Sequence, residues 1–213
     1  LVLFAGQPII LCAQTPEDIE ASLDTTAGEK QKVVVLLKAA KALNRTYPTN
    51  SIDFANRAVK KSVELQDIRL GSEAYSTLGF VLMNQGKYSE AVTPLKKAVT
   101  YRGRFAKKEV RQNRKLAQDY HLLGIAFTRL GQFKEADRVF NLQKTFALKS
   151  PNSEERAKAF LNLGKSSLRK KQYREALGLL KQAKIFAEQA KLKRTLLEIE
   201  NNIETASALM QSS

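Results

Sequence analysis

The side chains that most often perform chemistry are scarce in this sequence. Its 213 residues include one Cys, Cys12, and one His, His121. A disulfide framework or a Cys/His zinc site needs more of these residues, and a lone His is more often incidental than a pH sensor or a ligand contact. The sequence also has no Gly-rich phosphate loop, no paired catalytic carboxylates and no nucleophile motif. We therefore expect a protein that is not an enzyme and that uses no cofactor and no metal.

Basic residues are the second candidate for chemistry, because they bind anions. Residues 1–100 carry 12 Lys and Arg against 10 acids, whereas residues 101–213 carry 24 against 11, which gives a net charge of +15 overall. One basic run contains Arg102, Arg104, Lys107, Lys108, Arg111, Arg114 and Lys115. It could bind nucleic acid or an anionic membrane surface. With Phe105 as its one aromatic residue and no recognisable nucleic-acid module, it is better interpreted as a solvated helix extension.

The first residues of the chain are apolar and uncharged, and they are too short a stretch to span a bilayer. The small residue Ala13 precedes a polar, acidic segment, which is typical of the end of a secretory signal peptide. Leu11 departs from this pattern, because a small residue is preferred two positions before Ala13. The alternative is a buried N-terminal strand or helix. We expect residues 1–14 to end a signal peptide and the protein to be exported, with a cytoplasmic location as the alternative. Residues 15–30 read as a linker or a cap.

Three segments of the chain repeat one spacing of residue types. Each has an aromatic residue, a Leu–Gly pair three residues later, a second aromatic residue and then Glu–Ala; the segments are residues 75–91, 120–136 and 160–176. The first half places apolar residues at helical spacing, and the Gly after the Leu lets two helices approach closely. Gly86 and Gly131 mark a turn, where the third segment has Lys171. Each segment therefore predicts a helix–turn–helix unit.

These units resemble the tetratricopeptide repeat, a helix–turn–helix motif of 34 residues that stacks into a superhelix. The resemblance is strong over residues 72–190 and weaker upstream, where Leu43 stands in place of the Gly. It implies an all-α, right-handed α-solenoid over residues 31–213, with a capping helix at 192–210. The expected helix pairs lie near 31–66, 71–102, 105–149 and 153–190. Pro94 falls inside a second helix and is expected to bend it slightly.

In this family the outward positions of the first helices line a concave groove. The matching positions here are Phe80, Met83, Asn84, His121, Ile125, Arg129, Leu161, Lys165, Leu168 and Arg169. The resemblance implies a scaffold or sensor module that binds another protein or peptide. Cations beside an apolar strip favour a ligand with acidic groups. Some members clamp a terminal carboxylate with Lys and Asn at set positions, but Lys165 is the one suitable residue here, so that clamp is not expected.

Two further expectations concern context and assembly. A degenerate first repeat behind a signal peptide resembles the exported repeat regions of bacterial sensor and regulatory proteins. The capping helix or the exposed first pair could also join two copies of the chain into a homo-oligomer. The rival function is electrostatic binding of nucleic acid or anionic membrane through the basic second half, which would weaken steeply with salt.

Overall fold

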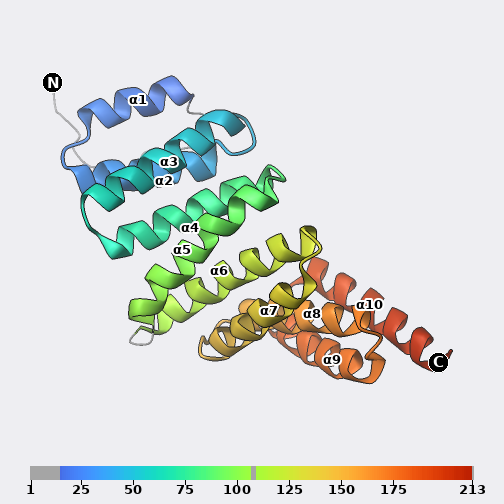
Figure 1. Ribbon diagram of the computed structural model, residues 1–213. Helices are drawn as coiled ribbons and strands as arrows, with labels where there is room; N and C mark the ends of the chain where they lie inside the picture. The colour runs from blue at the N-terminus through green and yellow to red at the C-terminus, as the bar shows by residue number, and fades with distance from the viewer. Residues whose placement is uncertain (1–14, 107–108, 213) are drawn as a thin grey trace.

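The computed structural model describes residues 15–106 and 109–212, and in that part of the chain it contains helices and no strand (Figure 1). The helices are α1 (Pro16–Thr25), α2 (Glu29–Ala42), α3 (Pro48–Glu64), α4 (Ile68–Asn84), α5 (Tyr88–Ala106), α6 (Val110–Arg129), α7 (Phe133–Leu148), α8 (Ser153–Arg169), α9 (Tyr173–Gln189) and α10 (Lys193–Gln211). Residues 1–14 lie outside the described residues, so the signal peptide and export stay predictions. Lys107 and Lys108 lie outside them as well.

The helices stack as antiparallel pairs in chain order. The pairs are α2/α3, α4/α5, α6/α7 and α8/α9, and α10 packs on α9 at the end of the stack (Figure 1). The first helices of successive pairs also contact one another, so α2, α4, α6 and α8 form one continuous face. We call this surface the groove face. The predicted all-α solenoid of four helix pairs with a C-terminal capping helix is confirmed.

Glycine allows the second, third and fourth pairs to close tightly. A Cβ atom at Gly79 would lie 2.5 Å from the Leu95 side chain, and one at Gly124 would overlap the ring of Phe140. Such overlap in a packed core costs about 1–3 kcal/mol. The Gly of each Leu–Gly pair is therefore needed because the partner helix leaves no room for a side chain. Among the turns, Gly131 has φ +72°, and Lys171 adopts φ +61° at the matching turn of the fourth pair. The turn geometry is thus kept where the Gly is not.

Helix α1 covers the open end of the first pair. Its buried residues Ile19 and Leu23 join the core formed by α2, α3 and α4, and its Glu20 pairs with Arg57 of α3. Residues 15–30 therefore fold largely as a cap.

Helix α5 contains Pro94 and continues through it without ending. No helix within residues 15–106 and 109–212 is long and apolar enough to cross a membrane.

The apolar core consists of several separate clusters along the stack. One cluster joins α1 to α4, a second joins α4 to α7, and a third joins α8 to α10. Between the third and fourth pairs lies a small cluster of Ala117, Ala147 and Ala159, with Phe146 packed against it. Leu163 of α8 belongs to the second cluster. The junction between the third and fourth pairs therefore combines Leu163, which extends the second cluster, with a separate cluster of three alanines.

Candidate functional site

The predicted apolar strip of the groove face belongs mainly to the core. Met83 and Leu161 are buried, and Phe80, Ile125 and Leu168 are half-buried against the core clusters. Neighbouring helices of the stack cover these side chains, which helical phase alone does not reveal. The apolar residues therefore offer less free surface than the sequence predicted.

Three of the four exposed predicted residues gather at one place. Arg129 of α6 and Lys165 and Arg169 of α8 line a cleft of about 400 Å³ between the two helices. Ile125 joins them, so four of the ten predicted groove residues meet there. The remaining lining residues are Thr128, Phe140 and Asn162. Asn84 is exposed but lies in a different depression, with Asn44, Arg45, Pro48 and Gln85.

The three cations of the cleft have different partners. Lys165 lies 2.8 Å from a carboxylate oxygen of Glu198 on α10, and Arg169 lies 3.8 Å from one of Asp137 on α7. Arg129 makes no ion pair within the described residues; its guanidinium lies 6.0 Å from the centre of the Tyr88 ring. Arg129 is therefore the cation best placed to accept an acidic group from outside.

A polar floor supports the cleft. The Asn162 side-chain nitrogen Nδ2 lies 2.8 Å from His121 Nδ1 and donates to Gln143 Oε1 at 3.0 Å. Burial, together with the nearby Lys158 and Lys165, lowers the pKa of His121 to about 4. The imidazole is therefore neutral near pH 7, and its Nδ1 can accept the Asn162 hydrogen bond. His121 serves here as part of the floor, held by its neighbours.

The junction between α4 and α6 contains a buried ion network. Arg102 is 1% exposed; its Nε donates to Asp119 at 2.7 Å and its Nη1 to Glu73 at 2.8 Å. Burial opposes the charge of Arg102, yet Asp119 and Glu73 outweigh it and raise its pKa. Glu73 also pairs with Lys115. Arg102 therefore lies inside the protein, which corrects the expectation of a single exposed basic run.

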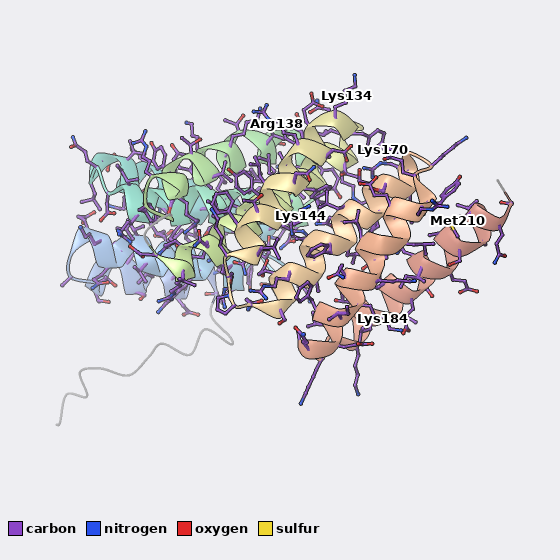
Figure 2. All side chains as sticks on the ribbon, turned by 90° about the horizontal axis from the view of Figure 1, so that it is seen from below. Lys134, Arg138, Lys144, Lys170, Lys184 and Met210 are labelled. Carbon is purple, nitrogen blue, oxygen red and sulfur yellow. The ribbon has the colours of Figure 1, made fainter. Side chains whose placement is uncertain are left out.

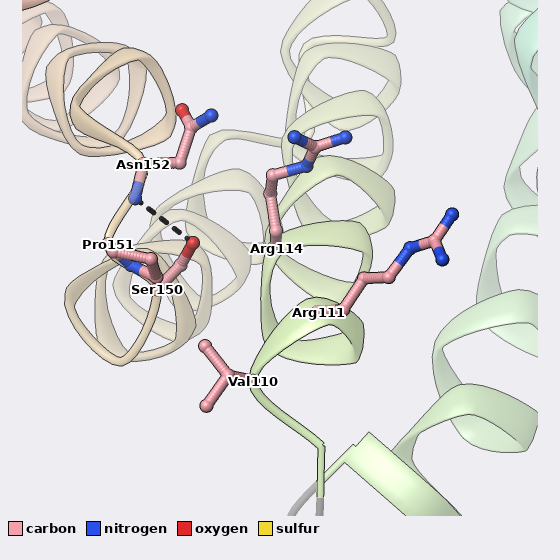
Figure 3. A pocket seen from close by; sticks show the side chains of 6 residues that line it. All are labelled: Val110, Arg111, Arg114, Ser150, Pro151 and Asn152. Carbon is pink, nitrogen blue, oxygen red and sulfur yellow. Dashed lines mark hydrogen bonds between the residues drawn. The ribbon is translucent and has the colours of Figure 1, made fainter.

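The other described residues of that run point elsewhere. Arg104 is exposed beside the Tyr101 ring. Arg111 and Arg114 are exposed and line a cavity of about 650 Å³ with Val110 and with residues 150–152 of the α7–α8 loop (Figure 3). The sequence run thus divides into an inner part, Arg102 and Lys115, and an outer part.

Sequence reasoning missed several residues of the cleft. Asn162 occupies the position directly before the Leu–Gly pair, where Thr77 and Leu122 stand in earlier units. Aligning the units at that position would have shown one amide on the groove face. Asp137 and Glu198 come from α7 and α10, whose approach to the cleft depends on the packing of whole helices. No group of three or more His, Cys, Asp and Glu side chains that could hold a metal occurs within the described part of the chain.

Fold and site together define a class of protein, a solenoid of stacked helix hairpins with a charged cleft on its groove face. Residues 72–104 match the family model described as Tetratricopeptide repeat. Residues 72–104 therefore contain a tetratricopeptide repeat, and the other helix pairs of the stack share its helix–turn–helix fold. No curated protein matches the sequence at a significant level.

Solved structures share the fold at low sequence identity. The apo form of RapI is 18% identical with a TM-score of 0.73, over 91% of this chain and 73% of that one. The STAND protein PH0952 from Pyrococcus horikoshii, which has a tetratricopeptide repeat sensor, is 11% identical with a TM-score of 0.74, over 89% and 29%. A Rap protein complexed with competence and sporulation factor is 16% identical with a TM-score of 0.72, over 92% and 57%. These likenesses establish the fold.

Proposed function

We propose that this protein is a non-enzymatic scaffold that binds another protein, or a peptide segment of one, on its groove face. Tetratricopeptide-repeat folds are typical of protein-interaction scaffolds, and a similar Rap protein is known in complex with a factor. The observation that carries the proposal is the cleft between α6 and α8, where three cations stand beside Ile125 and Phe140. A rigid stack presents this cleft preformed, so binding loses little ordering entropy.

The charge around the cleft favours a partner with acidic groups. Arg129, Lys165, Arg169 and Lys170 surround it, whereas the carboxylates within reach are Asp137 and Glu198. The site is therefore left with an excess of positive charge. Complementary charge of this kind speeds association and selects among partners more than it sets the total affinity.

The test compares two triple variants of the full chain as bait in the native cell, with crosslinking and mass spectrometry. The groove variant carries Arg129→Glu, Lys165→Glu and Arg169→Glu. The control carries Lys134→Glu, Arg138→Glu and Lys144→Glu on α7, three side chains outside the cleft that make no ion pair in the described chain (Figure 2). Both change the net charge equally. Circular dichroism verifies that both variants fold.

We expect the wild type and the control to recover one discrete protein that the groove variant loses. Recovery of that protein by all three baits would contradict the proposal. Recovery of nucleic acid or lipid by the wild type, with a steep loss between about 50 mM and 200 mM salt, would instead favour electrostatic binding through the basic second half.

A further inference from the structure

The two carboxylates at the cleft are held to different degrees. The side chain of Asp137 is 16% exposed, lies 2.6 Å from Lys170 and accepts a hydrogen bond from Ser166. The side chain of Glu198 is 47% exposed, and within the described residues its one ion pair is with Lys165, itself 45% exposed. Exposed ion pairs of this kind contribute little to stability and are screened by salt. Glu198 can therefore leave Lys165 at low cost, whereas Asp137 is fixed.

Glu198 also reaches the cleft from a distinct element. It lies on α10, the last helix of the stack, while Lys165 lies on α8. The neighbouring residue Glu200 pairs with Lys184 of α9 instead. One residue of the capping helix thus contacts a cation of the cleft, and a second residue two positions away contacts a different helix.

The walls of the cleft restrict what can enter. Ile125 and Phe140 form an apolar wall, and the Thr128 hydroxyl is already used in a hydrogen bond to the carbonyl oxygen of Gly124. A volume of about 400 Å³ admits one or two side chains. Arg129, which has no ion pair in the described part of the chain, lies on the helix facing Lys165. The arrangement suits a carboxylate side chain followed by an apolar one.

We infer that the cleft between α6 and α8 binds one acidic side chain of the partner, next to an apolar residue, and that this carboxylate displaces Glu198 from Lys165 while it pairs with Arg129. The inference deepens the proposed function and rests on it. Glu198 then acts as an internal competitor that occupies the site when no ligand is bound. Ligand binding therefore breaks the contact between Lys165 of α8 and Glu198 of α10, so the packing of the capping helix depends on whether the cleft holds a ligand.

Two substitutions separate this exchange from general charge attraction. Glu198→Gln removes the competitor and is expected to tighten binding by about twofold to fivefold, the range that an exposed ion pair allows. Glu200→Gln makes the same charge change on the same helix but frees Lys184, away from the cleft, and is expected to leave affinity unchanged. Arg129→Gln is expected to weaken binding about tenfold, because it removes the unpaired cation.

The test is a two-dimensional NMR titration of the full chain with a blocked heptapeptide, Gly-Ser-Leu-Glu-Leu-Ser-Gly, and with the same peptide carrying Gln in place of Glu. We expect the Glu peptide to shift the backbone amides of Ile125, Thr128, Asn162 and Lys165. The Gln peptide should bind about tenfold more weakly. The three variants are then titrated with the Glu peptide.

The outcomes separate the two proposals. Three results would overturn the inference that an acidic side chain of the partner displaces Glu198, which we call the acidic anchor. They are equal binding of the Glu and Gln peptides, equal affinity of the Glu198→Gln and Glu200→Gln variants, and no shift at the cleft. The groove-face proposal would survive any of these if capture in the native cell still depends on the groove variant. Shifts confined to α7 and α9 with either peptide would overturn the acidic anchor and count against the groove face as well.

Discussion

Helix α6 makes two junctions on the groove face, with α4 before it and α8 after it, and the same repeat positions are used differently in each. Asp119 lies five residues before its Leu–Gly glycine, and Ala159 holds that position in the next unit. Arg102 lies 23 residues after Gly79, and Ala147 holds that position. A buried Arg–Asp pair at the first junction is thus replaced by two alanine methyl groups at the second.

A second pair of equivalent positions shows the same contrast. Glu73 pairs with Lys115 across the first junction. At the second junction Gln118 stands in place of Glu73 and donates to Glu155 at 2.8 Å. The first junction therefore uses its cations internally, against its own carboxylates. At the second, Arg129 has no carboxylate partner among the described residues, and this is where the cleft lies. The comparison teaches that one backbone repeat can form a buried internal ion pair or leave a cation at an open cleft, according to whether its charges are paired inside.

The largest expected effect is at the first junction. Arg102→Met leaves Asp119, which is 1% exposed, without its cation, so the free energy of unfolding is expected to fall by about 3–5 kcal/mol. Urea denaturation followed by circular dichroism measures the change. The double variant Arg102→Ala with Asp119→Ala copies Ala147 and Ala159 and should recover much of the loss, because the two fully buried charges are removed together and Glu73 keeps its pair with Lys115. A loss below about 1 kcal/mol in the single variant would show that the pair does not clamp the junction.

A smaller effect follows from the floor of the second junction. His121 has a pKa of about 4 in the folded protein and about 6.5 when unfolded. As pH falls from 6.5 to 4, the unfolded chain takes up a proton that the folded protein does not, so the free energy of unfolding falls over that window. We expect His121 to lower the free energy of unfolding by about 2 kcal/mol over this window. This is less than the full pKa difference would give, because the side chain is partly exposed to solvent.

The measurement compares urea midpoints of the wild type and the His121→Gln variant from pH 7 to pH 4. Gln can still accept the hydrogen bond of Asn162 but does not titrate. The difference between the two proteins isolates His121 from the charged groups that face it, Lys158, Lys165 and Glu198. Parallel pH profiles would mean that His121 is protonated as readily in the folded protein as in the unfolded chain. Ser76, the equivalent residue at the first junction, has no such titration.

Much of this architecture could be predicted from the sequence, because close packing within a helix pair requires particular residue types at fixed spacing. The glycine of each Leu–Gly pair is required by one side chain of the partner helix, such as Leu95 for Gly79. That requirement repeats at fixed spacing and is visible without coordinates. The cations of the cleft were also predicted, since Arg129 and Lys165 follow from helical phase alone.

What could not be predicted depends on contacts between pairs. Arg102 belongs to a run that looks like solvated surface, and its partner Asp119 lies on the next helix, so its burial follows from the register between pairs. A position-by-position alignment would have placed it at the buried site of Ala147. Glu198 and Asp137 gave no signal, because helical phase says nothing of which distant helix end reaches a cleft. Met83 was expected on the surface and is covered by its neighbours.

The smallest expected effect tests whether the second junction is indeed free for binding. Lys165→Met removes the pair with Glu198, and because both side chains are nearly half exposed, the free energy of unfolding should change by less than about 1 kcal/mol. Urea denaturation at low and high salt measures this against Arg102→Met, with Lys184→Met as a matched control that removes the pair with Glu200. A loss of more than about 2 kcal/mol for Lys165→Met alone would make its pair structural, like that of Arg102. A partner's carboxylate could then not displace Glu198 cheaply, and the two junctions would differ in geometry but not in role.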